Sequence, residues 1–214
     1  MKFKAFIFDM DGTLLNTLAD IVDVTNRSLA SVGYPPRTTE EILGYIGNGN
    51  YRLLQQAVPD GAPKSIVDHA FESWKMLYGS YGNRHTRPFA GMVETLTQMK
   101  EKGVALAVLS NKYDAGVQML VKDHFSGLFD VAHGERPGIP RKPDPAGLLA
   151  IIDELGCEKS AVAYVGDADP DIETASRGGV YFIGVDWGFG GESFRADPRI
   201  DTRVAEPEQL LSFC

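Results

Sequence analysis

The stretch FIFDMDGT, residues 6–13, joins an apolar run directly to two aspartates one residue apart. The apolar run from Phe3 to Phe8 is too short for a helix of the same burial, so it predicts a strand buried on both faces of a sheet. Asp9 and Asp11 then stand at the carboxyl end of that strand. In parallel α/β sheets, ligands bind beyond these strand ends.

Three more short apolar runs predict strands of the same kind: Val104 to Leu109, Ala161 to Val165 and Val180 to Val185. Between them, apolar residues recur at helical spacing from Met92 to Lys102 and from Pro145 to Leu155, and each pattern stops at a glycine. Strands that alternate with helices predict the α/β class, with a Rossmann-like, doubly wound parallel sheet and helices on both faces.

The segment from about Thr17 to Tyr81 has a helical pattern and no comparable buried strand. It follows the first strand directly and returns at about Arg87-Pro88, so we interpret it as a helical insertion in the α/β core. We therefore expect an α/β core domain at residues 1–14 and 88–214 and a helical cap domain at residues 15–87. The two connections between them could act as a hinge.

Composition excludes several classes of protein. The 214 residues are 43% hydrophobic and 23% charged, enough for a sizeable core. A formal net charge of -8 argues against nucleic acid as a partner, because phosphate binding needs a basic face. Neither a secretory signal nor an apolar stretch of about 18 residues is present, so we expect no membrane partner and a cytoplasmic protein. The sequence leaves open whether the protein is a monomer or a homodimer.

Polar residues also follow the second and third predicted strands. Ser110-Asn111-Lys112 follows the second strand, and the segment GDADPD, residues 166–171, follows the third. Lys142 lies in the basic segment RKPDP, which opens the helix before the third strand. Because the carboxyl ends of parallel strands share one edge of the sheet, we expect these residues to meet Asp9 and Asp11 in one crevice.

This set of side chains suits a cation and a phosphate. Asp9, Asp11 and Asp167 offer hard oxygen ligands, and packing several carboxylates together is costly unless a cation neutralises them. Mg²⁺ is the natural candidate, since it is often held by one or two carboxylates and a substrate phosphate. Ser110 could donate its hydroxyl, and Lys142 its charge, to that phosphate.

Other interpretations of the same segments are weaker. Asp169-Pro170 and Asp144-Pro145 are typical of a helix N-cap followed by proline, so we first assign both pairs to structure. The loop that begins at Asp167 lacks the glycine and glutamate of a calcium-binding EF-hand. The glycine-rich segments at 47–49 and 188–191 do not complete a nucleotide-binding fingerprint.

The motifs together resemble those of the haloacid dehalogenase-like hydrolase superfamily: DMDGT at residues 9–13, Ser110 after a buried strand, Lys142 before a helix, and GDADPD at residues 166–171. Five longer segments are similar to the phosphoglycolate phosphatase-like group: IGNGNYRLLQQAV (46–58), RPFAG (87–91), AVLSNK (107–112), RKPDP (141–145) and VGDADPDIETA (165–175). The resemblance spans the whole chain.

The resemblance implies a role for each residue of the site. Asp9 would be the nucleophile that becomes an aspartyl phosphate, and Asp11 the general acid and base. The phosphoryl group would be bound by Thr13, Ser110, Asn111 and Lys142, and Mg²⁺ by Asp9, the backbone carbonyl of Asp11, Asp167 and Asp171.

The resemblance also implies that residues 15–87 form a mobile cap that closes over the crevice. Asn48 and Gly49 would then lie in its substrate-binding loop, although Gly and Asn also suit an ordinary turn between helices. Two residues depart from the phosphatase group: Ala168 replaces a common Ser or Thr, and Asp169 adds an acid beside the site.

The sequence thus predicts an Mg²⁺-dependent phosphatase that hydrolyses a small phosphorylated metabolite, with 2-phosphoglycolate as the leading substrate. A phosphomutase of the same fold, similar to beta-phosphoglucomutase, would use the same aspartyl phosphate and remains an alternative. A noncatalytic binding module that has kept the fold is a second alternative. A dehalogenase fits less well, because carbon–halogen attack needs neither Mg²⁺ nor Asp11.

Overall fold

A computed structural model describes residues 2–81 and 83–214. The chain divides into two compact units, a core unit made of Met1–Asn16 with Pro88–Cys214 and a helical unit made of Thr17–Arg87. Two short strands, β2 (Leu15–Asn16) and β3 (Arg87–Pro88), pair where the chain passes between the units. Among the described helices, none is long and apolar enough to cross a membrane.

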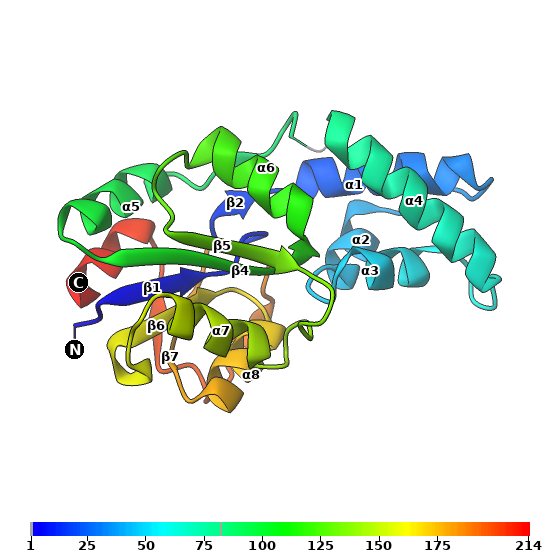
Figure 1. The fold of residues 1–214 in the computed structure, drawn as a ribbon. Helices are drawn as coiled ribbons and strands as arrows, with labels where there is room; N and C mark the ends of the chain where they lie inside the picture. Colours follow the sequence, from blue (N-terminus) through cyan, green and yellow to red (C-terminus); the bar gives the residue numbers. More distant parts are fainter. Residues whose placement is uncertain (1, 82) are drawn as a thin grey trace. The chain divides into compact units, whose positions relative to one another are not determined.

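The core unit is built on a six-stranded parallel sheet with the order β5-β4-β1-β6-β7-β8 (Figure 1). The strands are β1 (Ala5–Phe8), β4 (Ala105–Tyr113), β5 (Val131–Glu135), β6 (Val162–Gly166), β7 (Tyr181–Val185) and β8 (Thr202–Val204). When these six strands are numbered one to six along the chain, their order in the sheet is 3-2-1-4-5-6, which is that of a doubly wound fold. The direction of winding reverses between β1 and β6. The predicted fold class is confirmed.

Alternate residues of each central strand face opposite layers of helices. Phe6 and Phe8 of β1 pack in a core with α5 (Met92–Glu101), α6 (Asp114–His124) and the terminal 3-10 helix η2 (Pro207–Phe213). Ala5 and Ile7 pack in a second core with α7 (Ala146–Glu154) and α8 (Asp169–Gly178). Because both faces are covered, β1 is apolar at every position, as its sequence predicted.

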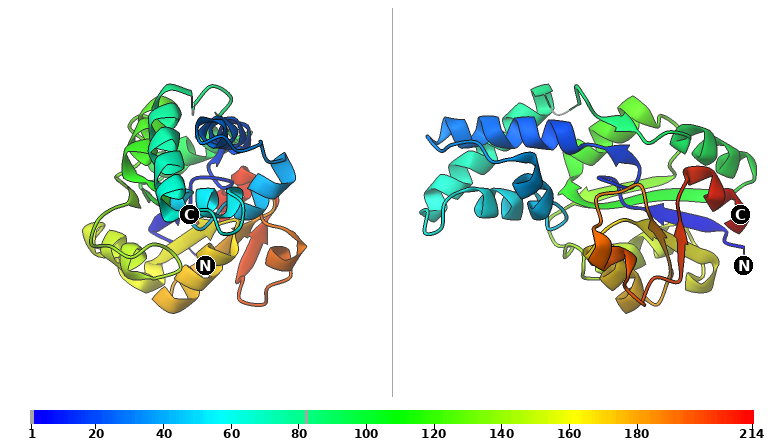
Figure 2. Two further views of the ribbon diagram at one scale, coloured as in Figure 1. Left: turned by 90° about the vertical axis from the view of Figure 1, so that its right-hand side faces the viewer. Right: turned by 180° about the vertical axis from the view of Figure 1, so that it is seen from behind.

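The C-terminal part of the chain completes the core unit. A short 3-10 helix, η1 (Lys159–Ala161), precedes β6, and α9 (Glu192–Arg195) precedes β8. The right-hand view of Figure 2 shows the part of the chain after β7, in orange and red, from behind. The amide of Phe3 donates to the carbonyl of Phe213 at 2.7 Å, so the two ends of the described chain lie side by side (Figure 1).

The structure corrects three details of the sequence-based interpretation. Strand β4 continues through residues 110–112 to Tyr113 instead of stopping at Leu109. Strands β5 and β8 were not predicted, since both are short edge strands without a continuous apolar run. Helix α8 begins at Asp169, and Asp171 rather than Asp169 accepts the amide hydrogen of the N-cap residue Ala168, at 3.1 Å. The N-cap assigned to Asp169 was therefore wrong.

In the described residues of the helical unit there are four helices, α1 (Leu18–Ser31), α2 (Thr39–Tyr45), α3 (Asn50–Ala57) and α4 (Lys64–Tyr81) (Figure 1). Helices α1 and α4 pack together. Within α4, the rings of Trp74 and Tyr78 stack, with their centroids 4.6 Å apart. Helix α2 was not predicted, although Thr38 and Glu41 form a capping box at its start.

Candidate active site

The carboxyl ends of β1 and β6 bring three buried acids together at the point where the sheet reverses its winding. Asp9 follows β1, Asp167 follows β6, and Asp171 lies in the first turn of α8. Each offers a carboxylate oxygen, and the three oxygens lie within 4.8 Å of one another. The side chains are almost inaccessible to solvent. Such a cluster of carboxylates can hold a metal ion.

Lys142 joins two of these acids. Its Nζ donates to Asp9 Oδ1 at 2.7 Å and to Asp171 Oδ1 at 2.7 Å, and only 3% of its side chain is exposed. With all three carboxylates ionised, the cluster and the one ammonium would carry two negative charges. A divalent cation would neutralise both, so the charges present fit such an ion.

The pKa values reflect this crowding of charge. Burial raises the pKa of Asp9 to about 7, because desolvation outweighs the neighbouring Lys142 ammonium and the charge of Asp171 adds to the rise. Burial also holds the pKa of Asp167 well above its usual range, helped by the charges of Asp9 and Asp171. For Lys142, burial lowers the pKa, but Asp171 and Asp9 outweigh it, so the group stays protonated.

Asp171 is held by a set of hydrogen bonds that sequence analysis did not anticipate in full. Tyr164 donates its hydroxyl hydrogen to Asp171 Oδ1 at 3.0 Å, and the amides of Asp167 and Ala168 donate to Oδ2 at 3.2 and 3.1 Å. The only signal for Tyr164 is that a phenol in an apolar strand needs a polar partner. Asp171 therefore fixes the loop between β6 and α8 and also orients Lys142.

Asn111 places the backbone of Lys142. Its Nδ2 donates to the carbonyl of Lys142 at 3.0 Å, and the amide of Lys142 donates to its Oδ1 at 2.8 Å. This reciprocal pair ties the end of β4 to the loop before α7. Asn111 was predicted to bind substrate, and that role stays a prediction.

Asp11 lies outside the carboxylate cluster and pairs with Lys112 instead. Lys112 Nζ donates to the two oxygens of Asp11 at 3.0 and 3.1 Å, and the Lys112 side chain is fully buried. The amide of Lys112 also donates to Ser110 Oγ at 3.2 Å, which leaves the hydroxyl hydrogen of Ser110 to donate elsewhere. Lys112 was not among the predicted site residues. Its position two residues after Ser110, at the same strand end, was the available signal.

Gly12 and Thr13 shape the turn that follows Asp9 and Asp11 and bring it against Asp167. Thr13 Oγ1 donates to Asp167 Oδ1 at 2.7 Å, so this predicted phosphoryl ligand contacts the cluster directly. Gly12 has a φ of 92°, and a Cβ built there would lie 2.2 Å from Asp167 Oδ2. Only glycine fits this turn.

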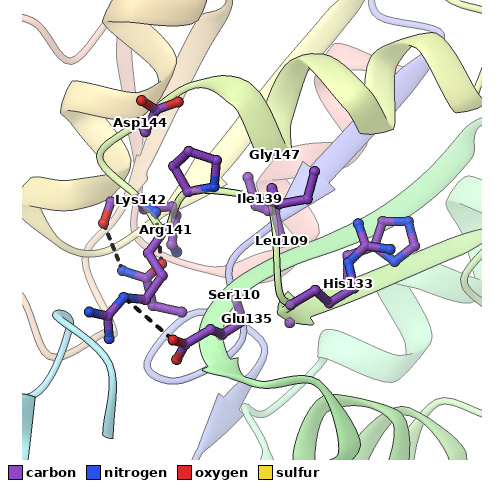
Figure 3. A pocket seen from close by; sticks show the side chains of 13 residues that line it. Leu109, Ser110, His133, Glu135, Ile139, Arg141, Lys142, Asp144 and Gly147 are labelled. Atoms are coloured by element: carbon purple, nitrogen blue, oxygen red, sulfur yellow. Dashed lines mark hydrogen bonds and ion pairs between the residues drawn. The ribbon is translucent and has the colours of Figure 1, made fainter. Parts of the chain in front are cut away.

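A narrow pocket opens beside the site, next to Ser110 and Lys142 (Figure 3). His133, Glu135 and Arg141 also line the pocket, and Arg141 Nε lies 3.7 Å from Glu135 Oε1. The pocket has about 10 Å³ of space for solvent, which is room for about one water molecule. The pocket in this structure therefore has room for water but not for a phosphate ester.

Asn48 and Gly49 belong to the helical unit, where they precede α3. Gly49 has a φ of 84° and is the N-cap residue of that helix. Their predicted contact with substrate stays a prediction.

The fold and the site define the class of protein. A doubly wound sheet with a helical insertion after the first strand, and lysine-bridged aspartates at its switch point, is an α/β enzyme fold built around an aspartate site. The chain belongs to the family of haloacid dehalogenase-like hydrolases, whose sequence profile matches residues 6–185.

Several relatives resemble the chain along most of its length. It is 34% identical to a phosphoglycolate phosphatase of Haemophilus influenzae over 88% of both chains. It is 32% identical to one of Thiobacillus denitrificans, covering 88% of this chain and 86% of the relative. A solved structure from Lactobacillus delbrueckii, provisionally assigned as a phosphoglycolate phosphatase, superposes with a TM-score of 0.90 at 32% identity, covering 98% and 97% of the two chains. The predicted resemblance is confirmed.

Proposed function

We propose that this protein is an Mg²⁺-dependent phosphatase that hydrolyses a small phosphomonoester. The observation that carries the proposal is the Lys142 ammonium held at 2.7 Å from both Asp9 and Asp171 inside a buried cluster of three carboxylates. A site with this excess of negative charge suits a divalent ion and a phosphoryl group together.

Asp9 would attack the phosphorus and form an aspartyl phosphate, which splits one displacement into two easier ones. Asp11 would give a proton to the leaving oxygen and later take one from the attacking water. Ser110 and Thr13 would hold the phosphoryl oxygens, and Lys142 would keep Asp9 in place and balance its charge. Mg²⁺, when bound by Asp9, Asp167 and Asp171 with the carbonyl of Asp11, would stabilise the charge of the transferring group.

The leading substrate is 2-phosphoglycolate, because relatives at 32% and 34% identity bear the name phosphoglycolate phosphatase. In this proposal the helical unit is the cap, with Asn48 and Gly49 in its substrate-binding loop, and the protein works in the cytoplasm.

A panel of phosphate esters, assayed with Mg²⁺ and with EDTA, tests the proposal. We expect Mg²⁺-dependent release of free phosphate, fastest from 2-phosphoglycolate. Asp9→Asn should lower turnover by at least about 10³-fold, as expected when a nucleophile is removed. Equal activity of Asp9→Asn and wild type would defeat the assignment of the nucleophile. Interconversion of sugar phosphates without phosphate release would instead identify a phosphomutase.

A further inference from the structure

The loop after β7, residues 186–191, contains the glycine-rich segment to which the sequence gave no function. In the structure this loop lies against Asp167. The amide of Phe189 donates to Asp167 Oδ2 at 2.7 Å. Trp187 Nε1 donates to the carbonyl of Thr13 at 2.9 Å, and the hydroxyl of Thr13 donates to Asp167 Oδ1. Both oxygens of Asp167 are therefore held, one directly by the loop and one through Thr13.

Two glycines of this loop make the close approach possible. A Cβ on Gly188 would lie 2.3 Å from Asp167 Cβ and 2.6 Å from the carbonyl oxygen of Gly12. A Cβ on Gly190 would lie 2.1 Å from the carbonyl oxygen of Asp167. Neither glycine has a positive φ, so the requirement is one of space and not of backbone conformation.

The requirement is confined to the residues that face Asp167. Gly191 is the next residue of the same loop, has a φ of -79°, and has no atom within 4 Å of a Cβ built on it. A loop that served only to connect β7 to α9 would not need glycine at 188 and 190 while leaving open space at 191.

We propose that Trp187-Gly188-Phe189-Gly190 is a backbone cradle that positions the Asp167 carboxylate and thereby sets the affinity of the site for its divalent cation. The inference rests on the proposed function. Each oxygen of Asp167 accepts one hydrogen bond, from Thr13 or from Phe189, and keeps a second lone pair for an ion. The cradle fixes the direction of those lone pairs.

The nature of Mg²⁺ makes this positioning matter. The ion demands nearly ideal octahedral geometry at about 2.0–2.1 Å, so a small displacement of one ligand weakens binding. Groups that orient a metal ligand typically contribute about 10–100-fold to metal affinity. The cradle residues are positioning residues, since they act through Asp167.

Gly188→Ala tests the cradle, with Gly191→Ala as the matched control in the same loop. Binding of Mg²⁺ to each full-length variant is measured by isothermal titration calorimetry, and folding is checked by circular dichroism. We expect Gly188→Ala to bind Mg²⁺ about 10–100-fold more weakly than wild type, and Gly191→Ala to bind it normally. Phosphatase activity of Gly188→Ala should recover as Mg²⁺ is raised, whereas a general loss of structure would not respond to the ion.

A milder variant decides the matter if Gly188→Ala does not fold. Trp187→Phe removes only the Nε1 donor to Thr13 and keeps an aromatic ring, and we expect its Mg²⁺ affinity to fall by about 3-fold or more, on the scale of a lost orienting contact. Wild-type affinity in a folded Gly188→Ala, or in Trp187→Phe, overturns the cradle. If wild-type protein neither binds Mg²⁺ nor hydrolyses esters, the proposed function fails instead, so the two failures are distinguishable.

Discussion

The two units of the molecule differ in the charge pairs that they bury. In the core unit, Lys142 and Lys112 are buried, and their partners Asp9 and Asp11 lie 133 and 101 residues away in the sequence. In the helical unit, pairs such as Lys64 with Asp68 join residues one helical turn apart and are largely exposed. Burying charge costs free energy, so the core unit accepts a cost that the helical unit avoids. Such a cost is typical of a functional site.

One acid of the helical unit breaks this pattern. Asp20 in α1 is 1% exposed, and its carboxylate accepts the amides of His85 and Thr86 and the hydroxyl of Thr86 at 2.6–3.1 Å. These donors are neutral and ordered by the fold. Asp20 therefore ties the start of the helical unit to its end, a structural use of buried charge.

Replacing Lys142 should have the largest effect. Lys142→Met leaves Asp9 and Asp171 without their shared ammonium, and breaking a buried pair in this way costs about 3–5 kcal/mol. Denaturant unfolding in EDTA measures the loss, and phosphatase activity should disappear with it. Lys64→Met is the matched change in the helical unit, where the pair is exposed and its loss should change the free energy of unfolding little. Equal losses of unfolding free energy in the two variants would show that burial of a charge pair does not decide how much the pair contributes to stability.

Replacing Lys112 should cost somewhat less, because Asp11 keeps 13% of its side-chain surface exposed. We expect Lys112→Met to lose about 3 kcal/mol of unfolding free energy, at the lower end for a buried pair. If Lys112 positions Asp11 for proton transfer, kcat/KM should fall about 10²-fold for an alkyl phosphate, and much less for p-nitrophenyl phosphate, whose leaving group needs no proton.

Lys112→Arg is the control for this variant, because it keeps the positive charge and should restore part of the activity toward the alkyl ester. A uniform loss of activity on both esters would assign Lys112 to general stability of the site instead.

Replacing Asp20 tests the exception in the helical unit. Asp20→Asn exchanges one acceptor oxygen for a donor that faces the amides of His85 and Thr86, so we expect a loss of about 1–3 kcal/mol. Hydrogen exchange should show faster opening of residues 17–20 and 83–87 than of β1. If hydrogen exchange of these two segments is unchanged in Asp20→Asn, Asp20 does not hold them together.

The sequence predicted the parts of the fold that depend on local patterns. The apolar runs at β1, β4, β6 and β7 predicted these strands correctly, because both faces of each strand are covered and the residues are therefore apolar. The edge strand β5 was not predicted, since His133 and Gly134 interrupt its apolar pattern. Strand β8 is only three residues long and offers no pattern to detect.

For the site, the sequence predicted the residues that lie at strand ends but not the contacts that hold them. That Lys112 pairs with Asp11, or that Phe189 donates to Asp167, depends on segments 101 and 22 residues apart meeting in space. The glycines at 188 and 190 were visible in the sequence. The reason for them was not visible, because it is contact in space with the side chain of Asp167 at Gly188 and with the backbone of Asp167 at Gly190.

The smallest expected effect is a pH-dependent gain in stability from Mg²⁺. In the metal-free protein the pKa of Asp9 is raised from 3.8 to about 7, so between these values the folded protein holds a proton that the unfolded chain has released. The free energy of unfolding in EDTA should therefore fall as pH rises through this window. Mg²⁺ binds the ionised carboxylates, so its stabilising effect should grow from pH 5 to pH 8.

Thermal unfolding midpoints in EDTA and in Mg²⁺ measure this stabilising effect, which we expect to reach a few degrees. Asp9→Asn removes one of the two carboxyls with a raised pKa, Asp9 and Asp167, and should reduce the trend in EDTA, whereas Asp68→Asn in the helical unit should leave it unchanged. If the difference between the unfolding midpoints in Mg²⁺ and in EDTA stays constant with pH, the buried acids of the core unit do not hold the ion.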